Sequence, residues 1–347
     1  MRVVLDLEQY HKMGSHCLTT CFVTLFRQKG VDMPEEVSLG LGSGLGFTYV
    51  RQKEGFIFGG RGGNLEQNLA AALGCEIVSN KTENRECAWQ YNRKLLEVGN
   101  PLICDVDMAY LPYMVEKLKT NGSGFSGHKL ILFGFDDEKN ETYVLDYLWN
   151  NIIIVNTDDF KSAASSSTKP ISPDNSSIYF QIPEELYPLE HSINSAIGYN
   201  VNQMRSPVGI GLGLKAIKRF YRELRNWPDI LNEHALRYEL NMAYFVFEKI
   251  GTGGGNFRRM YSRFLKFCAA KLKDENLMEV CRIYGVLGKL WKIVAFDLYN
   301  TSIDPNILNN KIFMRKYDIG DQILKLETEG IEQLERYIGG KKNAFYQ

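Results

Sequence analysis

The sequence has no long apolar run, no excess of charge of one sign and no regular cysteine framework. Without roughly 20 consecutive apolar residues it has no segment expected to cross a bilayer as a helix. Residues 1–10 also lack the basic and then apolar regions of a signal peptide. Basic and acidic residues are equal in number, 41 of each, so net charge predicts no polyanionic partner. We therefore expect a cytoplasmic protein that binds neither membranes nor nucleic acid.

Common metal and nucleotide motifs are also missing. The seven cysteines are an odd number without framework spacing, which predicts reduced thiols. The glycine-rich stretch 38–47 is followed neither by Gly-Lys-Ser/Thr nor by the helix and acidic residue of a dinucleotide fingerprint. We interpret it as a turn-rich loop near a site, whose backbone can approach a neighbour closely. A zinc site of His16, Cys17 and Cys21 would lack a convincing fourth ligand, so we expect no metal.

The sequence is long enough for two domains, with 347 residues of which 44% are hydrophobic. Short strand patterns end with residues 178–182, after a stretch (161–177) whose Ser, Pro, Thr and Asn content predicts an exposed loop. Later segments have helical periodicity instead, at 211–225, 230–250, 256–273, 276–298 and 318–338. We predict an α+β fold: a helix plus an antiparallel sheet over residues 1–182, and an all-helical domain over residues 183–347.

The first candidate for chemistry is Cys17, which stands at the start of a predicted helix. Gly30 is a stop signal for that helix, and its apolar residues recur at helical spacing: Leu18, Cys21, Phe22, Leu25 and Phe26. The unpaired N–H groups and the dipole of a helix start favour a thiolate over a thiol. The alternative is that Cys17 is one more small, buried core residue.

A predicted hairpin carries a histidine and an aspartate that could complete a site. Residues 127–135 form one expected strand, with His128 near its start, and the returning strand 142–146 ends at Asp146. Antiparallel neighbours can bring such side chains within hydrogen-bonding reach. Cysteine, histidine and aspartate together supply a nucleophile, a base beside it and an acid that orients the base. Taken singly, a core histidine and a strand-end cap remain the simpler explanations.

A glycine-rich break, Gly251 to Arg258, separates two predicted helices. It could let a long, thin ligand pass close to the backbone. We favour a turn between two helices that uses left-handed residues, because glycines often only punctuate structure.

The motifs together resemble the butirosin-type acyltransferases. The resemblance covers nearly the whole chain and rests on five short motifs: His16-Cys17-x-x-Thr20, the glycine-rich stretch 40–47, Asp107-x-x-Tyr-Leu-Pro-Tyr113, Gly127-His128 and the break 251–258. It implies a papain-like amino-terminal domain joined to a helical carboxy-terminal domain. It also implies transfer of an acyl or peptidyl group from a carrier-protein phosphopantetheine thioester to an amine, in nonribosomal-peptide-like biosynthesis. In one relative, which acts in closthioamide assembly, the acceptor is a diamine.

Carried over by position, the resemblance implies Cys17 as nucleophile, His128 as base and Asp146 as the residue that orients the base. It further implies substrate-binding roles for Gly44, Tyr110, Tyr113 and Arg258. No cofactor of its own is expected, because the thioester is already activated.

The oxyanion hole departs from the papain-like pattern. Papain-like proteases often place a glutamine six residues before the cysteine, and here that position is His11, with Gln9 further back. We take His11, with the Cys17 amide, as the oxyanion candidate.

Two other functions remain open. A peptidase with the same three residues would resolve the acyl-enzyme with water instead of an amine. A non-enzymatic carrier-binding protein would keep only a vestigial site. The oligomeric state is also open, and a homodimer is among the states considered.

Charge suggests where a carrier protein could dock. Residues 201–273 contain 14 Lys and Arg against 5 Asp and Glu, a net +9 that the rest of the chain balances. Within the predicted helix 215–225, Lys218, Arg222 and Arg225 lie at helical spacing, and with Arg258, Arg259 and Arg263 they could form a basic platform. Carrier proteins are generally acidic, so this platform is our candidate carrier-binding surface; the alternative is a solvated helix face.

Overall fold

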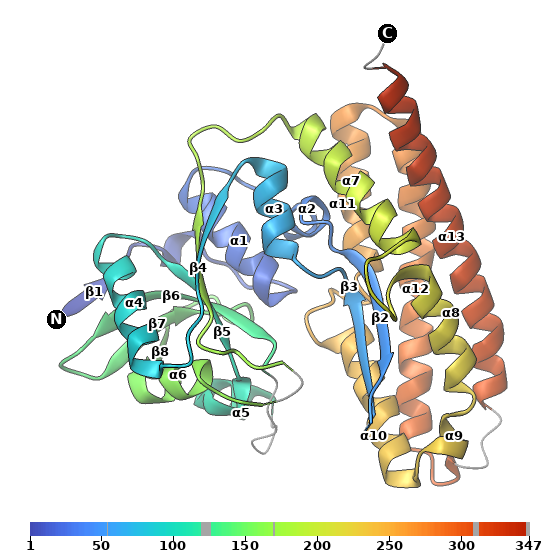
Figure 1. The fold of residues 1–347 in the computed structure, drawn as a ribbon, viewed down its shortest axis with the longest axis horizontal. Coiled ribbons are helices and arrows are strands. Elements are labelled where there is room, and N and C mark those ends of the chain that lie inside the picture. Colours follow the sequence, from blue (N-terminus) through green and yellow to red (C-terminus); the bar gives the residue numbers. More distant parts are fainter. Residues whose placement is uncertain (54, 119–125, 169–170, 308–311, 345–347) are drawn as a thin grey trace. The chain divides into compact units, whose positions relative to one another are not determined.

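The computed structural model describes residues 1–53, 55–118, 126–168, 171–307 and 312–344 (Figure 1). The chain forms two compact units, and each is built from two stretches of sequence. The first unit comprises residues 1–35 and 74–186, and the second comprises residues 36–73 and 187–347. In the described ranges, no helix is both long enough and apolar enough to cross a membrane.

The first unit is built on one antiparallel sheet of seven strands. Its order is β4-β9-β5-β6-β7-β8, and β1 pairs with the far end of β6. The strands are β1 (Arg2–Val4), β4 (Glu76–Asn80), β5 (Leu102–Val106), β6 (His128–Asp136), β7 (Glu141–Leu145), β8 (Ile153–Asn156) and β9 (Ser177–Gln181). Every residue of β6 except Lys129 is buried, as expected for a strand with neighbours on both sides.

Among the described residues, four helices and two short 3₁₀ turns complete the first unit. They are α1 (Cys17–Gln28), α4 (Arg85–Glu97), α5 (Pro112–Leu118) and α6 (Thr157–Ala164), with short turns η1 (Glu8–Tyr10) and η2 (Met108–Tyr110). Trp89 of α4 and Phe160 of α6 pack with Leu130 and Leu132 of β6 in one hydrophobic core. On α1, Phe22 and Phe26 contact Phe180 of β9 through their rings.

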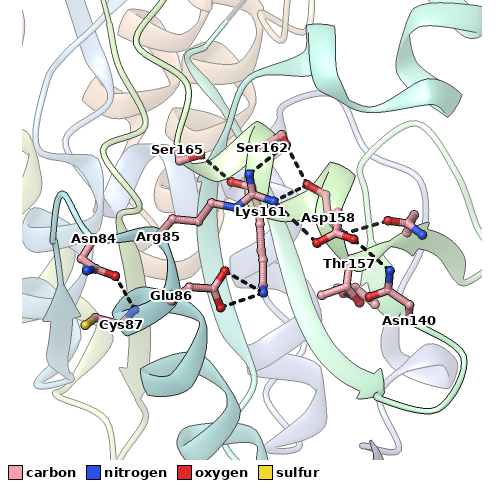
Figure 2. A network of polar contacts seen from close by, with 12 residues as sticks. Asn84, Arg85, Glu86, Cys87, Asn140, Thr157, Asp158, Lys161, Ser162 and Ser165 are labelled. Carbon is pink, nitrogen blue, oxygen red and sulfur yellow. Dashed lines mark hydrogen bonds and ion pairs between the residues drawn. The ribbon is translucent and has the colours of Figure 1, made fainter.

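A surface network links α4, α6 and the β6–β7 hairpin (Figure 2). The Lys161 ammonium lies 3.0 and 2.9 Å from the two carboxylate oxygens of Glu86, and Arg85 donates to the Asp158 carbonyl at 2.9 Å. Asn140, in the hairpin turn, donates to Asp158 Oδ2 at 3.0 Å. Exposed pairs of this kind contribute about 0–1 kcal/mol each, so the network orients the helices more than it stabilises them.

The second unit is helical apart from one hairpin, β2 (Leu45–Arg51) with β3 (Phe56–Arg61). Its first helices are α2 (Glu35–Leu41), which starts on the last residue of the first unit, α3 (Leu65–Leu73), α7 (Leu189–Arg205), α8 (Gly213–Leu224), α9 (Trp227–Ile230), α10 (Glu233–Tyr244) and the π-helical turn η3 (Phe245–Lys249). The last three helices are α11 (Arg258–Leu272), α12 (Glu275–Ser302) and α13 (Ile312–Ala344), which run side by side in Figure 1 with α12 in contact with both others.

The compact units depart from the predicted division in the segment 36–73. Aromatic packing explains why this segment belongs with the helices: the Phe47 ring centroid lies 5.2 Å from that of Trp291, and Phe56 stacks on Trp227 at 4.5 Å. Such pairs contribute beyond their buried area. The second unit is therefore not all-helical, because it includes the β2–β3 hairpin.

The predicted α+β class, a helix with an antiparallel sheet followed by a helical region, is confirmed. Two loop predictions were wrong. The stretch 38–47 holds the end of α2 and the start of β2, and the stretch 161–177 begins inside α6, where Ala163 and Ala164 are buried. Residues 169–170 of the latter lie outside the described residues.

Candidate active site

Cys17 is the first residue of α1 and is partly exposed, whereas the residues that follow it, Leu18 to Phe26, are all buried. The residue before it, His16, is extended (φ −142°, ψ 130°) and caps the helix: its Nδ1 accepts from the Thr19 amide at 3.2 Å. A capped helix start holds the thiol in the first turn, where the peptide dipoles favour negative charge.

Glu35 fastens this helix start, a role that the sequence did not suggest. Its carboxylate accepts from the amides of Ser15 at 2.8 Å and His16 at 3.2 Å, and the hydroxyls of Thr19 and Thr20 lie at 2.9 and 2.8 Å. Gly14 makes room for it, because a Cβ there would collide with Thr20 and Glu35. Glu35 is far from Cys17 in sequence and follows no motif, so no local pattern could have identified it.

His128 and Asp146 come together as the hairpin predicted. Ile131 of β6 pairs with Leu145 of β7, so Asp146, one residue past β7, lies beside the start of β6. His128 Nε2 is 2.8 Å from Asp146 Oδ2, and both side chains are almost fully buried. Because Nε2 faces the carboxylate, Nδ1 is the ring nitrogen left to exchange a proton with another group.

The imidazole is also hydrogen-bonded to Cys17, so the structure brings the three predicted residues together within the first unit. Burial alone would lower the pKa of His128. The charge and hydrogen bond of Asp146, with those of Cys17, outweigh burial and raise that pKa to about 10. The histidine is therefore held as an imidazolium beside the thiol at neutral pH.

Tyr113 also reaches the acid. Its hydroxyl donates to Asp146 Oδ2 at 2.9 Å, the same oxygen that faces His128. The other oxygen, Oδ1, is buried and has no hydrogen-bond partner among the described residues. The ring of Tyr147 lies next to the imidazole, with centroids 5.7 Å apart. The sequence motif drew attention to Tyr113, but as a residue that contacts substrate.

His11 is placed differently from the prediction. Its Nε2 lies 3.2 and 3.0 Å from the carbonyl oxygens of Asp146 and Trp149, and its Nδ1 is 2.9 Å from the Thr24 hydroxyl. Burial lowers the pKa of His11, so the ring is neutral and its one N–H belongs on Nε2, where two carbonyls accept it. No ring N–H remains for an oxyanion, so His11 ties the Asp146 segment to α1 instead.

Two of the substrate-binding candidates lie inside the second unit. Arg258 is fully buried: its Nε is 2.7 Å from Glu327 Oε1, and its Nη1 donates to the carbonyls of Gly46 and Gly60, both at 2.8 Å. Gly44 is buried in a turn, with its amide bonded to the Leu39 carbonyl at 2.8 Å. Both positions serve packing, which removes Arg258 from the basic platform as well. Tyr110, by contrast, is 47% exposed, so its predicted contact with substrate stays open.

The glycine-rich break is the predicted turn between helices. Residues 251 and 253–257 all have positive φ. A Cβ on Gly255 would collide with the backbone of Gly288, so the glycines there allow two segments to pack together.

The predicted carrier-binding residues lie on the solvent side of α8. Lys218, Arg222 and Arg225 are exposed, whereas the buried side of this helix carries Ala216, Ile217, Phe220, Tyr221 and Leu224. Their exposure agrees with either a docking surface or a solvated face.

Cys17 differs from the other cysteines in its surroundings. Five of the other six are buried, and burial raises the pKa of Cys21 well above its usual range and that of Cys75 to about 12. Cys87 is exposed and stands in the first turn of α4, where its amide donates to the capping Asn84 (Figure 2).

Two family models match the sequence. One, described as butirosin biosynthesis protein H, N-terminal, matches residues 16–147, a range that includes Cys17, His128 and Asp146. The other, described as a domain of unknown function, DUF4872, matches residues 158–334, which is 177 of the 347 residues. No curated protein matches the sequence, so nothing identifies the chain with the closthioamide enzyme.

Proposed function

The chain belongs to the DUF4872 family, and its amino-terminal part is similar to butirosin biosynthesis protein H; from this we propose that the protein is a cysteine-dependent acyltransferase. The bond that it forms is an amide. The donor would be an acyl or peptidyl thioester on a carrier protein, and the acceptor an amine. The observation that carries the proposal is the arrangement of Cys17, His128 and Asp146 in one unit.

In the first half-reaction, the Cys17 sulfur attacks the thioester carbonyl and forms a new carbon–sulfur bond. The tetrahedral intermediate collapses, the carrier thiolate leaves, and the His128 imidazolium supplies the proton that this thiolate takes up. The products are a Cys17 acyl-enzyme and a free carrier thiol. No oxidant or nucleotide takes part, because one thioester replaces another.

In the second half-reaction, the amine attacks the acyl-enzyme carbonyl. His128, now neutral, accepts the proton that the nitrogen loses, and the Cys17 thiolate leaves. Asp146 holds the proton on Nε2 in both steps, at 2.8 Å, so that Nδ1 handles every transfer. The amide and the resting thiolate–imidazolium pair result.

Product analysis tests this function against hydrolysis. Purified protein is mixed with acyl-loaded carrier and increasing amine, and amide and free acid are separated by liquid chromatography and mass spectrometry. Transfer predicts that amide forms with rising amine at the expense of acid, and that Cys17→Ala forms neither above background. Free acid alone at saturating amine would identify a hydrolase.

The basic face of α8 supports a carrier-protein partner. Lys218, Arg222 and Arg225 are exposed, and residues 191–222 contain no acidic residue at all. The loop before the helix exposes two large apolar side chains, Val208 at 93% and Ile210 at 85%. An acidic partner with an apolar contact residue complements this surface in charge and in hydrophobicity.

A further inference from the structure

We propose that Tyr113 is a positioning residue, whose hydroxyl fixes the Asp146 carboxylate and thereby sets the orientation of His128 and the pH at which His128 loses its proton. This inference rests on the proposed role of His128 as the base. It replaces the expectation that Tyr113 contacts substrate. The contact that motivates it is the 2.9 Å hydrogen bond from the Tyr113 hydroxyl to Asp146 Oδ2.

Several contacts fix the position of Tyr113, although it is distant in sequence from the hairpin that carries Asp146. Asp107 caps η2 by accepting the Ala109 amide at 3.0 Å, and its other oxygen accepts from the Ser166 hydroxyl at 2.7 Å. Pro112 then starts α5 with a backbone angle suited to a first helical turn. The Tyr113 ring meets Trp149 edge to face, with centroids 5.0 Å apart. The η2 cap, the start of α5 and the Trp149 ring therefore position the phenol independently of its hydrogen bond to Asp146.

The hydrogen-bonding of Asp146 shows why this contact matters. Oδ2 has two neighbours, His128 Nε2 and the Tyr113 hydroxyl, whereas Oδ1 is buried without a partner among the described residues. In the part of the chain that the structure describes, Tyr113 is thus one of two groups that hold the carboxylate in place. A buried carboxylate with few donors is more basic, and it then attracts the imidazolium proton more strongly.

The titratable groups near the His128 imidazole come from a few segments of the first unit. Cys17 comes from α1, and Asp146 and Tyr147 follow β7. Tyr113 contacts the Asp146 carboxylate, and His11 contacts the Asp146 backbone carbonyl. Burial, with the charge of Asp146, raises the pKa of Tyr113 well above its usual range, so the phenol keeps its proton and stays a donor. It cannot serve as a second base at working pH.

The test compares Tyr113→Phe with Tyr143→Phe. Tyr143 is a matched control in the same unit, because its hydroxyl also donates to a carboxylate oxygen, that of Glu141, at 2.9 Å. The imidazole of His128 is titrated by nuclear magnetic resonance in each protein, and acyl transfer is measured in parallel. We expect Tyr113→Phe to move the His128 midpoint to higher pH and to lower kcat roughly tenfold with little change in KM, in line with the loss of one hydrogen bond to a charged group. Tyr143→Phe should change neither.

Two results would overturn the proposal. One is an unchanged His128 midpoint and kcat in Tyr113→Phe. The other is a rise in KM alone, which would return Tyr113 to substrate binding. If the phenylalanine variant does not fold, 3-fluorotyrosine at position 113 keeps the hydroxyl as a stronger donor, and the midpoint should then move to lower pH. The titration needs no substrate, so it tests Tyr113 even if the protein transfers no acyl group.

Discussion

At the scale of single residues, Cys17 and Cys87 form a natural pair for comparison. Both stand in the first turn of a helix and both reach solvent, but only Cys17 is paired with His128. A thiolate held by an imidazolium persists at pH values where an isolated thiol is protonated.

We therefore predict that iodoacetamide modifies Cys17 faster than Cys87 near pH 6, because the His128 imidazolium stabilises the Cys17 thiolate. Peptide mapping by mass spectrometry gives both rates from one sample, so Cys87 is an internal control. Equal rates at pH 6, or faster labelling of Cys87, would show that Cys17 is not activated.

The pair His128 and Asp146 makes a prediction about pH. The pKa of His128 is raised from 6.5 to about 10, so the imidazolium and its attraction to Asp146 persist through neutral pH and are lost as pH rises through 10. The stability that this attraction adds to the fold is fully present below about pH 6.5 and is lost as pH rises through 10. Acyl transfer should accordingly fall on the alkaline side with a midpoint near pH 10.

Replacing Asp146 by Asn removes the charge that raises this pKa. The alkaline limb should then move to lower pH, and kcat should drop by roughly 10³-fold or more with KM nearly unchanged, because the acid orients the base and does not bind the acyl group. A variant that alters only KM would assign the orienting role to another residue. The pH profiles of both proteins, measured with a small thioester donor, decide between these outcomes.

At the scale of elements, the start of α1 depends on Glu35, which lies one residue before the chain enters the second unit. Glu35→Ala leaves the Ser15 and His16 amides without this acceptor. We expect amide exchange in the first turn of α1 to speed up roughly tenfold, the effect of losing about 1.5 kcal/mol of hydrogen bonding to a charged group.

The neighbouring Glu36→Ala is the control for this exchange measurement. Glu36 makes an ion pair with Arg263 at 3.6 Å, and both of these residues lie in the second unit. Exchange in α1 should be unaffected by this variant. Equal acceleration in both variants, or none in either, would contradict a special role of Glu35.

Comparison of the predicted with the observed helices and strands shows which features local sequence patterns can predict. The helical spacing of α1 and the strand patterns of β6 and β7 predicted a helix start at Cys17 and a hairpin that joins His128 to Asp146, because both depend on local sequence. The roles of Glu35, Tyr113 and His11 depend on contacts between segments far apart in sequence. The composition of residues 161–177 predicted a loop, but the burial of Ala163 and Ala164 favours a helix at its start.

At the scale of the whole molecule, the predicted division at residue 182 missed that residues 36–73 belong with the helices. Aromatic partners far along the chain decide this, as the contacts of Phe47 with Trp291 and Phe56 with Trp227 show. No pattern within residues 36–73 predicts that Trp291 and Trp227 are the contact partners. Arg258 is a second example of a contact that no local pattern predicts. Its charge predicted an exposed position, but it is fully buried in an ion pair with Glu327.

The charge distribution of the molecule yields a prediction about salt. If the exposed α8 cations steer an acidic carrier, transfer from a carrier-bound donor should fall steeply as salt rises, whereas transfer from a small thioester should hardly change. Reversing Lys218, Arg222 and Arg225 to Glu should reproduce this selective loss.

The control for charge alone is reversal of Lys266, Lys271 and Lys289, which are also exposed and lie on α11 and α12 of the same unit. This variant changes net charge equally but leaves α8 intact, so carrier-bound transfer should persist. Parallel salt curves for the two donors, or equal losses in both variants, would leave the α8 residues as solvated surface.

The most direct test of the central claim, that Cys17 carries the acyl group, is an intact mass spectrum after incubation with an acyl-loaded carrier. If Cys17 carries the acyl group, the protein gains the mass of one acyl group, mapped to Cys17 by peptide analysis, and loses it when amine is added and an amide is released. Cys17→Ala should show no adduct. Amide release by the alanine variant, or an adduct on any other residue that amine discharges, would show that Cys17 is not the acyl carrier.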